Sequence, residues 1–206
     1  DKEAFTTNIQ KTMHRILFFT IPAAVGIVML AKPITDLILG GGEFGEESLE
    51  MTSIILLFFA LSIPFESLTH LFARSYYAMK NTITPMIINV LSLGIIASVT
   101  IFLAPKLGIQ WFSIGFTIGF AIYTLLFILL LSRHFKNFKF KQLASSLSKI
   151  LIASVLMGAT LYYSENIGLN LPDKLVHVLR IALGGGVYLL AAYALKSPEL
   201  TSVNYI

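Results

Sequence analysis

Three ionisable side chains recur at helical spacing within one apolar stretch of the chain. Glu66, His70 and Arg74 occupy positions i, i+4 and i+8, so a helix places them along a single face. Ionisable groups at membrane depth are energetically costly and usually serve function. This face could therefore line a cavity and contact a charged substrate or a proton. The alternative is a structural ladder of ion pairs at a hydrated helix end.

The remaining ionisable residues do not form an enzyme site. The chain has no cysteine and only four histidines, and it lacks the zinc-protease, nucleophile-elbow and phosphate-loop motifs. Lys32 and Asp36 form a second pair at i,i+4 spacing, for which an interfacial ion pair is the favoured interpretation. We therefore predict a protein that is not an enzyme and that needs no metal or cofactor.

Proline and glycine mark where helices bend or approach closely. Pro22 and Pro64 stand inside apolar runs, where each removes a backbone hydrogen bond and predicts a kink. Transporters use broken helices for gating and binding, although membrane helices also tolerate proline without such a role. Gly184, Gly185 and Gly186 lower helix propensity. They predict a close crossing, a bend or a groove for a lipid tail, and ordinary packing explains them about as well.

The composition shows which solvent these helices need. Of the 206 residues, 56% are hydrophobic and 13% charged, with a mean hydropathy of +0.80, whereas soluble domains have roughly 25% charged residues. This balance excludes a soluble single-core domain and a disordered chain, and it predicts an all-α, polytopic transmembrane helical bundle. Six apolar stretches predict six spans, at residues 16–31 (extending to 39), 51–65 (extending to 74), 85–104, 110–132, 150–164 and 175–195.

The positive charges predict the orientation of these spans. Most of the 15 lysines and arginines fall on the side that holds both termini, and cytoplasmic loops carry such an excess. We therefore expect both ends of this chain to be cytoplasmic and the acidic loop at residues 43–50 to lie outside. The basic segment 133–149 predicts attraction to anionic membrane lipids. Because no nucleic-acid-binding fold accompanies it, no nucleic-acid partner is expected.

Small and aromatic residues predict how the spans pack. Gly115 and Gly119 stand four residues apart in one span and permit close helix contact, with ordinary packing favoured over a dimer. An aromatic belt at the membrane interface is predicted by four aromatic residues that stand mostly near span ends, Trp111, Tyr162, Tyr163 and Tyr188.

Two sequence motifs resemble those of a known family. Residues 30–44, LAKPITDLILGGGEF, resemble the segment L-A-x-P-I-x-x-L-L-F-x-R-G-x-F of MurJ (MviN-type) lipid II flippases. Residues 72–85, FARSYYAMKNTITP, resemble the more specific L-A-R-x-F-Y-A-x-x-D-T-x-T-P of the same family. IPAAVG at 21–26 and LAPKLG at 103–108 also match. The resemblance extends from about residue 16 to residue 132, and the last two spans agree in hydropathy and order only.

The resemblance implies a place for this chain within a larger transporter. The family has fourteen spans, and this chain corresponds to spans nine to fourteen. Residues 1–142 would form the C-terminal part of the second transporter lobe, and residues 143–206 two additional C-terminal helices. A chain that begins with Asp1 rather than Met agrees with a fragment. The implied partners are the N-terminal half of the same transporter, membrane lipids and lipid II, and the implied location is the inner membrane.

The resemblance also implies a mechanism and roles for individual residues. Such flippases move the undecaprenyl-linked peptidoglycan precursor outward by alternating access, so the helices of Pro22 and Pro64 would rearrange between inward and outward states. Arg74 matches a family-typical basic residue. The position of His70 usually holds Lys, and Glu66 departs from a position that is normally apolar.

Two further sites follow from the resemblance. Residues 147–195 would form the apolar groove that holds the polyprenyl tail. Ile96 and Thr100 stand where some members bind sodium, and the Ile96 side chain cannot coordinate a cation. Two alternatives stay open at this point. One is another exporter of the same superfamily, moving an O-antigen-type lipid carrier or a drug. The other is a non-transporting membrane scaffold in cell-wall assembly.

Overall fold

The structure, a computed structural model, describes residues 2–41, 45–134, 140–164 and 172–197. Within these ranges the regular elements are helices, as the composition predicted. In chain order they are α1 (Lys2–Met29), α2 (Ala31–Leu39), α3 (Glu46–Ala60), α4 (Ile63–Ala78), α5 (Ile83–Leu107), α6 (Gln110–His134), α7 (Phe140–Ser164) and α8 (Asp173–Ala194). The motif residues 42–44, with Glu43 of the acidic loop, lie outside the described ranges.

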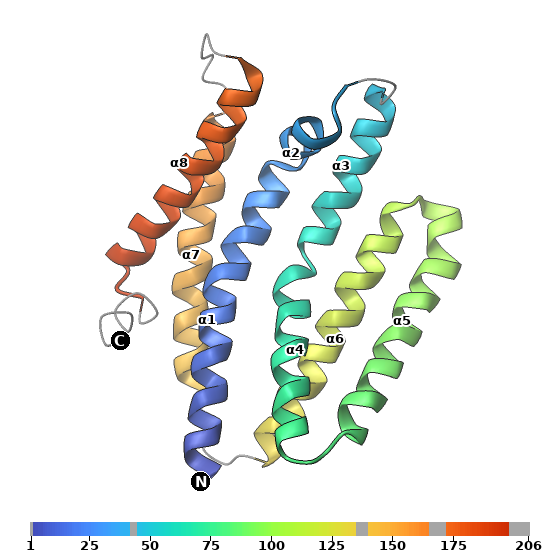
Figure 1. Cartoon of the computed structure of the whole chain (residues 1–206), viewed down its shortest axis with the longest axis vertical. Coiled ribbons are helices and arrows are strands. Elements are labelled where there is room, and N and C mark those ends of the chain that lie inside the picture. Colours follow the sequence, from blue (N-terminus) through green and yellow to red (C-terminus); the bar gives the residue numbers. More distant parts are fainter. Residues whose placement is uncertain (1, 42–44, 135–139, 165–171, 198–206) are drawn as a thin grey trace.

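The number of spans agrees with the sequence prediction. Five helices are long and apolar enough to cross a membrane, and α3 with α4, bent by 43° at a short break, makes a sixth when the pair is counted as one span. The six spans alternate in direction, so α1 begins at the same end of the bundle at which α4 ends and α5 begins (Figure 1).

The helices pack side by side in an order that differs from the chain order. Moving across the bundle, the order is α8, α7, α1, the α3–α4 pair, α6 and α5 (Figure 1). The short α2 lies at the end opposite the N-terminus, where it packs against α3 and touches α8. We call this the α2 end of the bundle. The helix α1 therefore lies between the last two helices on one side and α3, α4, α5 and α6 on the other.

The core lies where α1, α4, α6 and α7 meet. Met13, Phe72, Phe127 and Ile150 are among its most deeply buried side chains. The rings of Phe72 and Phe127 stack across α4 and α6 with centroids 5.7 Å apart. The outward faces remain apolar, as with Leu190, which is 71% exposed. Such faces are stable only in a bilayer, where exposed aliphatic surface meets lipid rather than water.

The helices begin earlier than the apolar stretches predicted. The structure starts α1 at Lys2 and α7 at Phe140, whereas hydropathy placed these spans at residues 16 and 150. The extra turns are amphipathic: Thr6, Ile9 and Met13 are buried at helical spacing, with polar residues between them. Hydropathy detects the membrane-embedded part of a helix, whereas packing extends the helix beyond it.

The first span also ends earlier than predicted. The sequence extended it amphipathically to residue 39, but the structure breaks the helix at Leu30. The break has a local cause at Pro33, which has no N–H to donate to the carbonyl of Met29, four residues earlier. The chain turns there and α2 begins as a separate element.

Candidate functional site

The bend between α3 and α4 is produced by Ser62 and Pro64. Because Pro64 has no N–H, it cannot donate to the carbonyl of Ala60. The Ser62 N–H donates instead to the Phe59 carbonyl at 2.9 Å, and the Ser62 hydroxyl donates to the same oxygen at 2.8 Å. Regular bonding resumes when the Glu66 N–H donates to the Ser62 carbonyl. Pro22 differs, since α1 stays helical through it and breaks only at Leu30.

Two hydroxyls on α6 fasten the bent pair on both sides of its break. The Thr117 hydroxyl lies 3.1 Å from the Phe58 carbonyl, before the break, and 3.3 Å from the Ser113 carbonyl of its own helix. The Thr124 hydroxyl donates to the Phe65 carbonyl, after the break, at 3.2 Å. The two threonines are seven residues apart, and so are the two residues whose carbonyls they contact. The contacts therefore fix the register of α6 against the bend.

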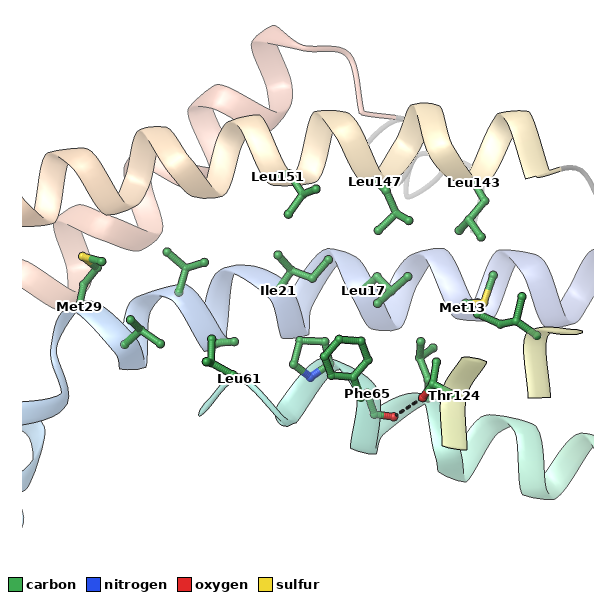
Figure 2. Close-up of a pocket in the computed structure, with 16 residues that line it drawn as sticks. Met13, Leu17, Ile21, Met29, Leu61, Phe65, Thr124, Leu143, Leu147 and Leu151 are labelled. Carbon is green, nitrogen blue, oxygen red and sulfur yellow. Dashed lines mark hydrogen bonds between the residues drawn. The ribbon is translucent and has the colours of Figure 1, made fainter. Parts of the chain in front are cut away.

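An apolar cavity of about 470 Å³ lies beside this bend. Its wall combines side chains of α1, α4, α6 and α7, and Leu61 from the break itself. Figure 2 shows Leu143, Leu147 and Leu151 of α7 on one side of α1, and Leu61 and Phe65 on the other. The cavity can therefore accommodate hydrocarbon or movement of the bend, and offers little to a polar ligand.

A second apolar groove, of about 450 Å³, lies where α1 and α2 meet α7 and α8. Pro22, Gly184, Gly185 and Tyr188 are among the residues that line it. A Cβ at Gly184 would come within 3.1 Å of Leu161 on α7, whereas a Cβ at Gly185 would meet no atom within 4 Å. Gly184 therefore permits close helix packing, and Gly185 keeps the groove open. Gly186 is not among the lining residues.

Tyr188 fastens α8 to α1 next to this groove. Its hydroxyl donates to the Phe18 carbonyl at 2.6 Å, and the two rings lie 5.3 Å apart. The expectation that Tyr188 belongs to an interfacial belt was wrong, because the side chain is only 5% exposed. The carbonyl four residues before Pro22 is that of Phe18, which the missing proline N–H leaves free to accept.

The three residues of the predicted polar face remain on one side of α4. Glu66 is half-buried, while His70 and Arg74 are exposed. The α4 residues that line the cavity beside the bend are Pro64, Phe65 and Leu68, so the polar face lies outside it. In the part of the chain that the structure describes, no ion pair joins the three side chains. The described residues of α4 therefore do not form the ladder of ion pairs.

The motif at residues 72–85 serves packing and the start of α5 as well as the polar face. Phe72, Tyr76 and Pro85 are buried. The Asn81 carboxamide oxygen accepts from the Thr84 N–H at 3.0 Å, and its nitrogen donates to the Thr84 hydroxyl at 2.9 Å. These bonds hold Asn81, in the turn before α5, against the first turn of that helix.

The close contact between α5 and α6 depends on Gly119. The Ser92 hydroxyl donates to its carbonyl at 2.7 Å, and a Cβ added to Gly119 would collide with the Ile96 side chain. Gly115 likewise packs against Val99. Ile96, whose side chain was not expected to coordinate a cation, is thus a buried packing residue here.

A third cavity, of about 500 Å³, lies at the α2 end and is polar. Lys32 and Asp36 of α2 line it, together with Glu46 of α3 and with His177 and Arg180 of α8. The sequence suggested only the Lys32–Asp36 pair, and both side chains are exposed. It gave no signal that α8 would bring two further basic residues to the same place, because this follows from packing between distant segments.

Comparison with known proteins identifies the family. The family model described as lipid II flippase MurJ matches residues 1–181. The lipid II flippase MurJ of Thermosipho africanus is 29% identical over 190 residues, which cover 92% of this chain and 38% of that protein. A probable lipid II flippase MurJ of Bdellovibrio bacteriovorus is 29% identical over 192 residues, covering 93% of this chain and 34% of that protein.

A solved structure agrees with these relatives. A lipid II flippase MurJ in an inward closed conformation superposes with a TM-score of 0.81 at 27% identity, covering 93% of this chain and 39% of the solved one. The matches do not favour the other exporters or the scaffold that the sequence left open. The chain spans about two fifths or less of the length of these relatives, and it belongs to the family of MurJ lipid II flippases.

Proposed function

We propose that this chain forms part of a flippase that moves lipid II, the undecaprenyl-linked peptidoglycan precursor, across the inner membrane by alternating access. The observation that carries the proposal is the family match over residues 1–181 together with the shared fold. The remaining spans come from the N-terminal half of the same transporter. Residues 1–142 belong to its second lobe, and residues 143–206 add two helices. Moving a lipid makes and breaks no bond, so no catalytic residue is needed.

The groove between α1, α7 and α8 suits the polyprenyl tail of that substrate. Its lining is almost wholly apolar, and a long hydrocarbon chain gains favourable transfer energy along such a surface. Gly185 leaves space at the groove wall where any larger side chain would project. We place the tail against this part of α8.

The bend between α3 and α4 suits an element that moves when its hydrogen bonds to α6 are released. Broken helices recur in transporters because a span with few bonds across its break can change angle at low cost. The cavity beside Pro64 and Phe65 gives the bend room to move. The polar face of Glu66, His70 and Arg74 lies outside this cavity. We place that face toward the transport pathway and the N-terminal half, because exposed charge on a membrane helix requires a polar environment.

The orientation can be tested by labelling single cysteines, since this chain contains none of its own. Glu46 lies at the α2 end and Lys80 at the other end, and both are exposed. With any other cysteine of the full-length protein removed, Glu46→Cys should react with an impermeant thiol reagent in intact cells. Lys80→Cys should react only after lysis. The reverse pattern would overturn the orientation.

The transport proposal is tested by two matched glycine variants of the full-length protein. A Cβ at Gly185 or at Gly186 would meet no atom within 4 Å, but only Gly185 lines the groove, so Gly185→Leu projects into it. We expect Gly185→Leu to reduce the appearance of lipid II at the outer leaflet at least tenfold, with Gly186→Leu near wild type. Equal transport by both variants would exclude the tail groove. Unchanged lipid II exposure after depletion of the protein would exclude the flippase itself.

A further inference from the structure

The polar cavity at the α2 end joins charged groups from three helices. Lys32 and Asp36 share one face of α2, and Glu46 stands in the first turn of α3. His177 and Arg180, three residues apart on α8, face them. Lys32 and Arg180 carry two positive charges and the carboxylates carry two negative ones. The charges of these four side chains therefore balance.

Arg180 is held in position with bonding capacity to spare. Its Nε donates to the Ser164 hydroxyl and its Nη2 to the Leu161 carbonyl, both at 3.2 Å. A guanidinium has five N–H groups, so three remain for an acceptor in the cavity. His177 Nδ1 is buried and has no hydrogen-bond partner in the part of the chain that the structure describes. Such a group is costly unless a further partner arrives.

The polar cavity lies next to the apolar groove. On α8, Arg180 lines the cavity and Ile181 the groove, and on α2 Pro33 lines the cavity and Ile34 the groove. Leu161 lines the groove, and its carbonyl anchors Arg180. A ligand that fits both parts has a hydrocarbon chain and a charged head. The site stands at the ends of membrane helices, where lipid headgroups lie.

We infer that this site binds a zwitterionic phospholipid whose headgroup carries a phosphate and an ammonium group, with an acyl chain in the neighbouring groove when that groove does not hold the polyprenyl tail. The phosphate lies against Lys32 and Arg180, which donate hydrogen bonds to it, and beside His177, which lines the same cavity. The ammonium lies against Asp36 and Glu46. A purely anionic headgroup would place negative charge beside two carboxylates without compensation, so the charge balance favours the zwitterion. The inference concerns lipid binding alone and does not rest on the transport proposal.

Native mass spectrometry of the full-length protein in detergent tests this inference. Phosphatidylethanolamine and phosphatidylglycerol with the same acyl chains are added separately at equal concentration. We expect clearly more bound phosphatidylethanolamine than phosphatidylglycerol. Phosphorylethanolamine, which has the headgroup without the chains, should not displace the bound lipid at the same concentration. Equal binding of the two lipids, a preference for phosphatidylglycerol, or displacement by the free headgroup would each overturn the inference.

Charge variants separate the site from other lipid contacts. Lys32→Gln should lower phosphatidylethanolamine binding about fivefold, while Lys32→Arg keeps it. Glu46→Gln should lower phosphatidylethanolamine binding and raise phosphatidylglycerol binding, a reversal that loss of folding would not produce. Glu47→Gln is the matched control, because Glu47 is equally exposed in the same helical turn but does not line the cavity. Wild-type lipid preference in Lys32→Gln and Glu46→Gln would exclude this site.

Discussion

The hydroxyl of Thr124 on α6 donates to the carbonyl of Phe65 on α4, just beyond the break that separates α3 from α4. Thr117 makes the equivalent contact with Phe58 before the break. These side-chain bonds tie each half of the bent span separately to one straight helix. The 43° bend is thus held from outside as well as permitted by Pro64 from within.

Thr124→Val should loosen the bent span while preserving the size of the side chain. Interhelical hydrogen bonds in membrane proteins contribute about 0.6 kcal/mol on average and up to about 1.7 kcal/mol, so we expect a stability loss of about 1 kcal/mol. Thr160→Val is the control, since that hydroxyl bonds only to Leu156 of its own helix. Unfolding of the full-length protein by a denaturing detergent measures both. Equal effects of the two substitutions would contradict the proposed tie.

Gly119→Ala should disrupt the contact between α5 and α6. The added Cβ would collide with Ile96, a buried side chain with little room to move. Overpacking of this kind typically costs about 1–3 kcal/mol. Gly94→Ala on α5 meets open space and should be close to neutral. Unfolding measurements on both variants check this, and a Gly119→Ala protein as stable as Gly94→Ala would show that α5 shifts freely.

The sequence was most informative where a single residue controls the local backbone. Gly119 marked a close helix contact because glycine has no side chain to keep two helices apart. Pro64 marked the neighbourhood of the α3–α4 bend because proline has no backbone N–H to donate. The break at Leu30 was missed because the amphipathic pattern extended the first span past Pro33. The absent N–H of Pro33 ends α1 there.

Contacts between distant segments could not be predicted from local pattern. Tyr188 and Phe18 are 170 residues apart, and nothing near either one indicates the other. The polar cavity likewise depends on α8 reaching α2. The polar face on α4 was predictable from its spacing, whereas its position outside the neighbouring cavity depended on which side of α4 packs against the core.

Tyr188→Phe should weaken the attachment of α8 to α1. The substitution keeps the ring contact with Phe18 but removes a buried hydrogen bond of 2.6 Å, which contributes about 1 kcal/mol. Tyr193→Phe is the matched control, because Tyr193 is 75% exposed on the same helix. Protease cleavage of the α7–α8 region under partly denaturing conditions should rise for Tyr188→Phe alone. Similar cleavage of both variants would mean that the Phe18 contact does not hold α8.

Arg74→Glu should abolish function without removing the protein from the membrane. Arg74 is exposed on the polar face of α4, and no ion pair within the described residues explains its charge. If the face borders the transport pathway, reversing this charge repels the phosphates of the substrate. Lys80→Glu reverses an exposed charge at the same end of the bundle and should be tolerated. Complementation of a depleted strain, with membrane levels measured in parallel, distinguishes the two. Growth supported equally by Arg74→Glu and Lys80→Glu would assign Arg74 to the surface rather than to the pathway.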